Sequence, residues 1–505
     1  MKKFTKILVC LMLCVFGFGL IACGDPRTEE EKKFTYPSSS DVVYGNGGLA
    51  VKKGNYVYFV NGYTSVNDIS KKKAKYTLGS LMLMKLDENG NVVRDEDGLL
   101  KDDYYIKMSN KLCGYEATNL FISGNYLYFA TPSLENESGD KVWAKERVVF
   151  KRIKLDKSSE VEEIYSSGVK VDNLQYQYYE ANGKLYILAW EKGESYYVDN
   201  RTDALIRVDV SSKSSTVISK NVQDVVFAEN HNEIFFTKHS NDDDYYFLKQ
   251  YNIANNDVTN YSSFEKTFDL VDVQDGKVFI TTAHEFGSST DVKSSQISSH
   301  AGFELLYGYS SADSVNVTPN GNVVLVSSNV ITIVKGVDDV VSITDSEAST
   351  IDIIDYANGC ILYYDTTDDG SNLKTVSYSD ALNDNPVAIQ KLTSIIKVQE
   401  DCAYFDFNED EDMLYFYTIG GQSENNYYLH RVQVNGNTQE SEMFGAYVDG
   451  DEPVEEETEE VEEEEFSAHD SKKSFGSIEK KQNVADSVDG EEEIAQAWAK
   501  YYGGK

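Results

Sequence analysis

One short pattern returns along most of this chain, and it constrains the fold more than any other feature. Each copy has a turn residue, usually Gly, Asn or Asp, followed by a strand in which aliphatic and aromatic residues alternate. Clear copies begin at Gly54, Gly124, Gly183, Asn232, Gly276, Gly321 and Gly359. A further copy lies at either Asp401–Phe405 or Asp412–Phe416. Such recurrence is typical of architectures whose repeated units bury their hydrophobic faces against their neighbours.

Each copy is followed by further alternating stretches, so a unit contains three or four short strands. Equivalent stretches are Val149–Leu155, Leu205–Val210, Phe247–Ile253 and Tyr428–Val434. Units of this size match the ~40–50 residues of a propeller blade. The pattern therefore predicts an all-β protein with little helix: a β-propeller of seven or eight blades over residues 47–446, with eight favoured. The alternative is a pair of β-sandwiches built from the same strands.

Composition supports sheet over helix, since the chain has 36 tyrosines and 23 phenylalanines but only 6 prolines. Closure of the ring should leave only short, protected strand edges. We expect Met443–Tyr447 to close it by pairing with an early strand such as Gly48–Lys52.

The N-terminus has the features of a bacterial lipoprotein signal. Lys2, Lys3 and Lys6 precede an apolar run that ends at Leu20-Ile21-Ala22-Cys23. We expect removal of residues 1–22 and attachment of acyl chains such as palmitate to Cys23, with residues 23–46 as a tether. Two acyl chains would hold the protein on the extracytoplasmic face of the cell membrane. An ordinary secretory signal or an uncleaved anchor helix are the alternatives.

Cysteine usage does not indicate a disulfide framework. Cys10 and Cys14 leave with the signal, and Cys113, Cys360 and Cys402 remain besides Cys23. A Cys360–Cys402 bridge is an alternative, but the two positions resemble equivalent points of neighbouring repeats, which usually lie too far apart for a disulfide. Buried free thiols are expected.

The charge of the chain, −37, argues against nucleic acid and anionic lipid surfaces as partners, because phosphate binding requires clustered Lys and Arg. Basic peptides, cations and neutral sugars remain compatible with it. The single dense basic run, Lys71–Lys75, is expected to be a solvated loop rather than an anion site.

The repeats resemble a known family on two motifs. Gly54–Phe59 reads GNYVYF, Gly124–Phe129 reads GNYLYF, and Leu205–Asp209 reads LIRVD. In these motifs the chain is similar to the propeller lipoproteins of Gram-positive bacteria. That family is grouped with a domain of unknown function, which has been likened to the propeller of low-density-lipoprotein receptors. The resemblance implies a surface-exposed module that binds a ligand or partner, and it transfers no catalytic residue.

The widest spacings between repeats fall early in the chain and place long loops at Thr64–Tyr76, Asp95–Tyr105 and Ser133–Lys145. Long loops on a rigid scaffold often bind ligands or partners, and they also often tolerate inserted residues without any binding role.

No sequence-local motif for catalysis, a metal or a cofactor is found. The histidines are dispersed: His231, His239, His284, His300, His430 and His469. Three acidic stretches offer hard oxygen ligands but none completes a calcium loop, so acidic turns are expected and calcium is unsupported: Asp95–Gly98, Asp365–Gly370 and Asn408–Asp412. An axial site assembled from several blades would be invisible in sequence.

The composition changes after Tyr447. Asp449–Glu465 has no basic residue, so residues 447–466 are expected to be a disordered acidic linker. Residues 467–505 form a flexible tail with a short helix over 491–502, where Ile494, Trp498 and Tyr501 share one face.

Together these observations favour a lipid-anchored binding module for a protein or carbohydrate ligand at the cell envelope. A propeller hydrolase or lyase with an axial site is the minority alternative, and an envelope assembly factor that uses the tail is a third. The ligand and the oligomeric state stay open.

Overall fold

The chain forms an eight-bladed β-propeller, in agreement with the favoured blade number. The computed structural model describes residues 25–64, 78–96, 98–112, 119–132, 148–169, 173–193, 203–228, 233–240, 245–284, 289–300, 302–367, 370–395, 404–420, 426–435 and 437–447. Two compact units are distinguished, Met1–Val454 and Glu455–Lys505, and the second lies outside the described residues. The predicted tail and its helix therefore stay predictions.

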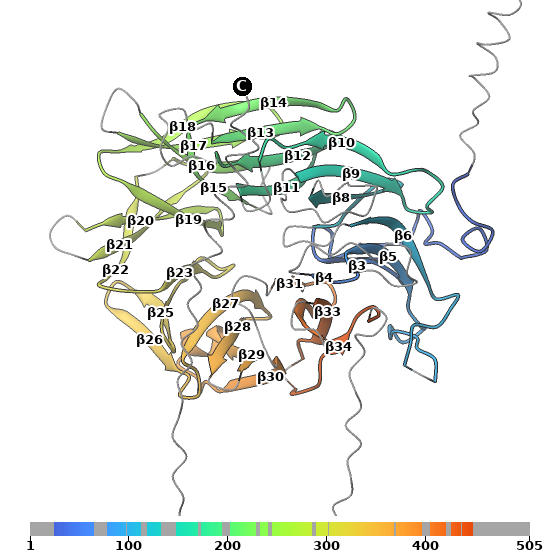
Figure 1. The fold of residues 1–505 in the computed structure, drawn as a ribbon. Coiled ribbons are helices and arrows are strands. Elements are labelled where there is room, and N and C mark those ends of the chain that lie inside the picture. The colour runs from blue at the N-terminus through green and yellow to red at the C-terminus, as the bar shows by residue number, and fades with distance from the viewer. Residues whose placement is uncertain are drawn as a thin grey trace, which may run out of the picture. The chain divides into compact units, whose positions relative to one another are not determined.

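Every blade is an antiparallel sheet whose strands follow the chain from the centre outward (Figure 1). The inner strands are β2 (Ala50–Lys53), β7 (Phe121–Ser123), β11 (Leu174–Ala181), β15 (Val222–Phe227), β19 (Phe268–Gln274), β23 (Ser314–Val317), β27 (Thr350–Ala357) and β31 (Phe405–Asn408), and in the first blade β1 (Val43–Tyr44) pairs with the inner edge of β2. The second strands are β3 (Tyr56–Val60), β8 (Tyr126–Pro132), β12 (Lys184–Glu191), β16 (Glu233–His239), β20 (Lys277–Ala283), β24 (Val323–Ser327), β28 (Cys360–Thr367) and β32 (Met413–Ile419).

The outer half of each blade completes the sheet. The third strands are β5 (Ser80–Lys85), β9 (Val148–Lys154), β13 (Ala204–Asp209), β17 (Tyr246–Asn252), β21 (Thr290–Gln296), β25 (Val330–Gly336), β29 (Gly370–Ser377) and β33 (Asn426–Gln433). The outermost strands are β6 (Tyr105–Leu112), β10 (Glu162–Ser166), β14 (Ser214–Lys220), β18 (Asp257–Phe264), β22 (Glu304–Tyr309), β26 (Asp339–Thr344), β30 (Ile389–Ile395) and β34 (Glu442–Met443). Within the described ranges the one helix is α2 (Tyr378–Leu382), capped by the Ser377 side chain.

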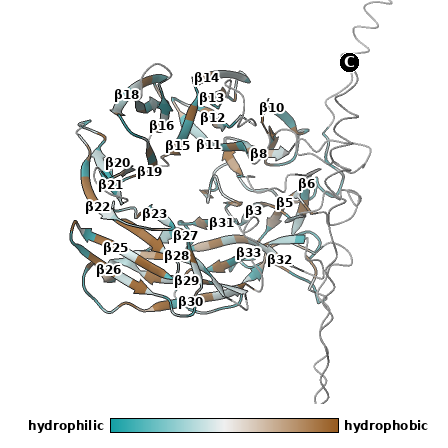
Figure 2. Ribbon diagram, turned by 60° about the vertical axis from the view of Figure 1, so that its left-hand side comes forward, coloured by the Kyte–Doolittle hydropathy of each residue, from teal (hydrophilic) through white to brown (hydrophobic). Residues whose placement is uncertain are grey.

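The repeat pattern corresponds to the second strand of each blade. Because successive side chains of a strand point to opposite faces, each second strand packs against two neighbouring blades at once. In β16, Ile234 and Phe236 pack between blades 3 and 4, whereas Phe235 packs between blades 4 and 5. Each interface between adjacent blades holds one hydrophobic cluster in the described part of the chain. Figure 2 shows the corresponding hydrophobic stretches along the strands.

Tight turns before the second strands define the start of each copy. Asn182 and Gly183 both have positive φ, 52° and 70°, as do Asp275 and Gly276 at 48° and 68°. This conformation fits a two-residue hairpin and favours Asn, Asp and Gly. The structure also settles the ambiguous copy, because Asp412 has a φ of 51° and directly precedes the second strand β32. Phe405, at the end of the other candidate, begins the inner strand β31.

The ring closes between blades 8 and 1 by a route that the sequence analysis did not predict. The expected pairing of Met443–Tyr447 with Gly48–Lys52 is wrong. Residues 442–443 form β34 and pair with β33, while β2 pairs with β3 and with β1 (Val43–Tyr44). The strand contact that joins the two blades is instead β4 (Tyr63–Thr64), which pairs with β33. Side-chain packing and hydrogen bonds between the two blades complete the closure.

Candidate functional site

The two faces of the ring differ in their connections. The turn face carries the connections between the first and second strands and between the third and fourth strands of each blade. The loop face carries the connections between the second and third strands and those that lead to the next blade. On the loop face, the connections 61–79, 133–147 and 192–203 of blades 1 to 3 are long, whereas 328–329 and 368–369 of blades 6 and 7 are short.

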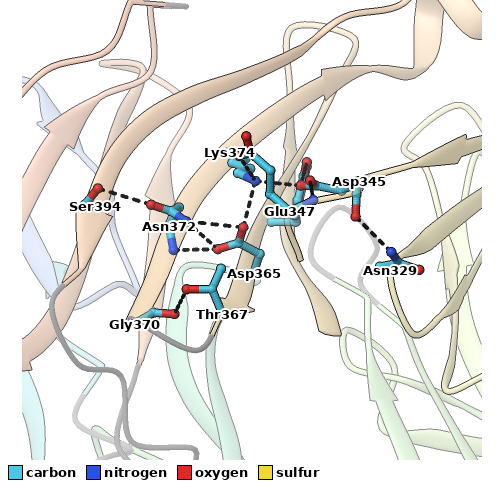
Figure 3. Close-up of polar contacts among 10 residues, drawn as sticks. Asn329, Asp345, Glu347, Asp365, Thr367, Gly370, Asn372, Lys374 and Ser394 are labelled. Carbon is cyan, nitrogen blue, oxygen red and sulfur yellow. Dashed lines mark hydrogen bonds and ion pairs between the residues drawn. The ribbon is translucent and has the colours of Figure 1, made fainter. Parts of the chain in front are cut away.

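A densely connected, buried polar cluster lies on the loop-face side of blade 7 (Figure 3). Its centre is Lys374 of β29, whose Nζ lies 2.7 Å from Asp345 Oδ2 and 2.7 Å from Asp365 Oδ2. The three side chains are 3%, 5% and 0% exposed. A central strand of a blade is covered on both faces, so a lysine there is buried and requires buried partners.

Other groups satisfy the remaining oxygens of the two carboxylates. The Tyr363 hydroxyl donates to Asp345 Oδ2 at 3.0 Å, and the Glu347 backbone N–H donates to Asp345 Oδ1 at 3.2 Å. Asn372 donates its backbone N–H to Asp365 Oδ1 at 2.6 Å and its side-chain amide to the same oxygen at 3.0 Å. Asp345 lies in the connection from blade 6, so the cluster ties two blades together.

The charge states of this cluster follow from its contacts. Burial would raise the pKa of the Asp345 carboxyl, but hydrogen bonds from Lys374, Glu347 and Tyr363 hold it below its usual value. Burial would lower the pKa of Lys374, but the hydrogen bonds to Asp345 and Asp365 raise it above its usual value. Lys374 thus stays a charged ammonium that is paired with two carboxylates. This state suits a residue that holds two blades together and does not suit a nucleophile, which requires a neutral amine.

A second polar feature recurs on the inner strands. Asp224, Asp272 and Asp355 each follow an irregularity in the strand pairing of β15, β19 and β27. Each carboxylate accepts the backbone N–H of the next residue, at 2.9, 2.7 and 2.7 Å. Burial raises the pKa of Asp224 and Asp272 above the ordinary value.

Inner-strand carboxylates also join neighbouring blades. Asp406 Oδ2 of β31 accepts the backbone N–H of Leu49, at 2.9 Å, across the junction of blades 8 and 1. Asp224 likewise accepts the backbone N–H of Leu270 in the next blade. These contacts satisfy backbone groups on the open inner edges, so the Asp224 and Asp406 carboxylates serve the scaffold.

The residues singled out from the sequence do not converge. The four histidines in the described ranges have separate surroundings: His239 packs on Tyr246, His284 Nδ1 lies 2.7 Å from Asp291 Oδ1, His300 packs on Tyr261, and the half-buried His430 of β33 has Nδ1 3.2 Å from Ser441 Oγ. Within those ranges, no set of three or more His, Cys, Asp or Glu side chains is arranged to hold a metal ion.

The acidic stretches take different roles. Asp95 Oδ1 accepts the Leu99 backbone N–H at 2.9 Å, as in an ordinary turn. In Asn408–Asp412, the Asn408 side chain accepts the Asp410 backbone N–H, and Glu411 pairs with Lys52. Asp365 instead belongs to the buried Lys374 cluster, which the sequence analysis missed. The available signal was a lysine in a third strand that both faces of the sheet cover.

Several predicted features lie outside the described residues: Cys23, Lys71–Lys75, Cys113, Cys402, His231, His469 and nearly all of the two longest loops. Cys360 is a half-buried free thiol, and burial raises its pKa. Among the residues that the structure describes, no helix has the length and apolar character needed to cross a bilayer.

No protein-family model and no curated protein matches this chain. Solved structures resemble it in fold. One is a prolyl endopeptidase, with a TM-score of 0.43 and 13% identity over 65% of this chain and 49% of that chain. The propeller domain of the Trilobed protease from Pyrococcus furiosus has a TM-score of 0.40 and 11% identity over 65% and 95%. Dipeptidyl peptidase 4 of Porphyromonas gingivalis has a TM-score of 0.43 and 9% identity over 81% and 61%.

The chain thus spans about half the length of the prolyl endopeptidase. At these identities the likeness concerns the propeller fold alone.

Proposed function

We propose that this protein is a lipid-anchored extracytoplasmic β-propeller, of the kind found among Gram-positive lipoproteins, which binds a ligand or protein partner at the cell envelope. Cys23 is the lipid attachment site in this proposal. The observation that carries the binding role is that three neighbouring blades each place a long connection on the same face. Blades 1 to 3 place the connections 61–79, 133–147 and 192–203 on the loop face of a closed, rigid ring, whereas the turn face of these blades has one of similar length, 86–104 in blade 1.

The chemistry of the loop face suggests the class of ligand. Its connections between blades expose the acidic residues Glu265, Asp313 and Glu347 together with Lys266, and its connection 61–79 contains the basic run Lys71–Lys75. The three exposed carboxylates attract cationic groups and can accept hydrogen bonds from hydroxyls. We therefore propose a basic peptide segment or a carbohydrate as the ligand.

Lipid attachment is tested first. Cys23→Ala should abolish acyl labelling in cells and release the protein from the membrane fraction, because the acyl chains provide the attachment. Cys360→Ser, which alters a half-buried free thiol, is the matched control and should leave labelling unchanged. Membrane retention of the unlabelled Cys23→Ala protein would contradict the proposal.

The binding role is tested by shortening the loop face. Replacement of residues 133–147 and of 194–202 by Gly-Asn-Gly should remove binding to a carbohydrate array or basic peptide library without lowering the thermal midpoint by more than a few degrees. Asn125→Ala with Lys184→Ala, on exposed turn-face positions, is the control. Binding that survives the loop replacements but is lost in the control would contradict a loop-face ligand site.

A further inference from the structure

A segment preceding the first blade is fastened to the turn face. We call residues 25–44 the N-terminal strap. Its first turn is closed by reciprocal bonds, since the Glu31 carboxylate accepts the Thr28 backbone N–H at 2.8 Å and the Thr28 hydroxyl accepts the Glu31 backbone N–H at 3.2 Å. This is a capping box, which stabilises a short turn in the absence of a long helix.

Aromatic packing holds the middle of the strap. Phe34 and Tyr36 pack against the hydrophobic cluster between blades 1 and 2. The Phe34 ring lies edge-on to Tyr36 at 5.3 Å and to Tyr56 at 6.3 Å. Tyr56 is the first residue of β3 and directly follows the turn at residues 54–55, so these contacts lie at the turn face.

Polar contacts attach the strap to the turn-face connection between β9 and β10 in blade 2. Lys157 Nζ donates to Glu31 Oε1 at 2.5 Å, and both side chains are mostly buried, at 19% and 18% exposed. Arg27 NH1 donates to the backbone carbonyl of Asp156 at 3.3 Å. These contacts hold the chain close to the point where it leaves the described residues, at Asp25.

The end of the strap joins the same face of blade 1. Lys53 Nζ donates to the carbonyl of Asp41 at 2.6 Å, and the Gly54 backbone N–H donates to the carbonyl of Val42 at 3.1 Å. Val43 then pairs with Lys53, at the turn-face end of β2. Both ends of the strap are therefore fixed to the turn face.

We propose that the turn face of blades 1 and 2 is the membrane-proximal surface and that the loop face points away from the lipid. This inference rests on the proposed lipidation of Cys23. One residue separates Cys23 from Asp25, so the linker between the lipidated cysteine and the strap spans at most about 7 Å. Such a short linker keeps the strap at the phospholipid head groups. The turn face of blades 1 and 2, to which the strap is fixed, is held there with it.

The orientation results from the short linker and not from attraction between charged residues and the head groups. The strap exposes Lys32 and Lys33 but also Glu29 and Glu30, so it carries both signs next to the head groups. The orientation should therefore persist at high salt, because screening weakens only exposed charge interactions.

The experiment compares reporters at the two ends of single strands. Lys184→Cys and Lys192→Cys lie at the two ends of β12, and Asn320→Cys and Ser328→Cys lie at the two ends of β24. Each is labelled with a donor in a lipidated protein that carries Cys113→Ser, Cys360→Ser and Cys402→Ser. The acceptor is a head-group dye in phosphatidylcholine vesicles. The ends of β12 differ in height by about 25 Å at 3.3 Å per residue.

Energy transfer should be several-fold faster from the Lys184→Cys and Asn320→Cys positions than from their loop-face partners. Insertion of eight Gly/Ser residues between Gly24 and Asp25 should reduce this difference while the protein stays bound. Equal or reversed transfer in vesicle-bound protein would overturn the orientation and leave the lipidation standing. Failure to float with vesicles would overturn the lipidation, and the orientation with it.

An epitope inserted at the same positions gives a reading that does not depend on the cysteine substitutions. On intact cells, antibody should bind the epitope at Ser328 far better than the epitope at Asn320. Equal antibody binding at the two positions would contradict the proposed orientation.

Discussion

Asn61 and Ala446 exchange two hydrogen bonds across the junction of blades 1 and 8. Asn61 Nδ2 donates to the Ala446 carbonyl at 3.1 Å, and the Ala446 backbone N–H donates to Asn61 Oδ1 at 3.1 Å. Both groups are buried. A side-chain amide thus takes the place of a neighbouring strand and satisfies the backbone of a segment 385 residues away.

Asn61→Ala should lower the free energy of unfolding by about 2–4 kcal/mol, because it leaves the N–H and carbonyl of Ala446 buried without partners. Urea denaturation of the full chain measures the change. Asn255→Ala, at an exposed turn, is the control and should change the stability by less than about 0.5 kcal/mol. Equal effects of the two substitutions would show that the Asn61 bonds do not stabilise the closure.

Lys374→Met should lower the free energy of unfolding by at least about 3 kcal/mol, because Asp345 and Asp365 would lose their buried counter-charge. The added substitutions Asp345→Asn and Asp365→Asn should recover part of the loss. Lys335→Met removes the ion pair with the exposed Asp384 and should cost less than about 1 kcal/mol. A triple variant no more stable than Lys374→Met would argue against charge as the cause.

His430 should make stability depend on pH. Burial, with a smaller contribution from the Arg94 charge, lowers its pKa from 6.5 to about 4. The unfolded chain takes up a proton below pH 6.5 and the folded chain only near pH 4, so stability contributed by neutral His430 is present above pH 6.5. This contribution, roughly 3 kcal/mol, is lost as the pH falls from 6.5 to about 4.

The measurement is a series of urea titrations between pH 7.5 and 4 on the wild type and on His430→Gln. The variant should lose less stability over that range. His300→Asn, at an exposed position with a φ of 47°, should follow the wild-type profile. Parallel profiles for wild type and His430→Gln would rule out His430 as the titrating group.

Two truncations that end only a few residues apart should differ sharply in thermal stability, because the boundary between the propeller and its tail lies between them. A chain ending at Val448 should keep its thermal midpoint to within a few degrees, because it retains the contacts of Phe444 and Ala446. A chain ending at Ser441 should lose ten degrees or more, since it removes both residues, including the edge-on packing of Phe444 on Phe59 at 4.9 Å. Differential scanning calorimetry distinguishes the two. A large loss at Val448 would place part of the closure in the tail.

The blade pattern was predictable because its determinants are local. In Lys277–Ile280, alternation places Val278 and Ile280 on one face and Phe279 on the other, and the preceding turn at Asp275-Gly276 requires positive φ. Both signals lie within a few adjacent residues. Eight such units accounted for the architecture without any knowledge of which residues meet across the ring.

The acidic stretch Asp365–Gly370 shows where local pattern stops being informative. By composition it is a turn, and it does contain the connection 368–369 between β28 and β29. Asp365 itself is fully buried, and its role depends on Lys374 in the next strand and on Asp345 in the connection from blade 6. The groups that surround a buried charge in the folded protein determine its stability, and the local sequence pattern does not show which groups these are.

Strand alternation and turn chemistry were sufficient to predict an all-β propeller and to favour eight blades, because a strand that packs on both faces must repeat its hydrophobic pattern wherever a blade begins. The closure through Asn61 and Ala446, the role of β4 and the Lys374 cluster required the folded structure. Each joins segments whose contact depends on how all eight blades fill the circle, and no short stretch of sequence encodes that geometry.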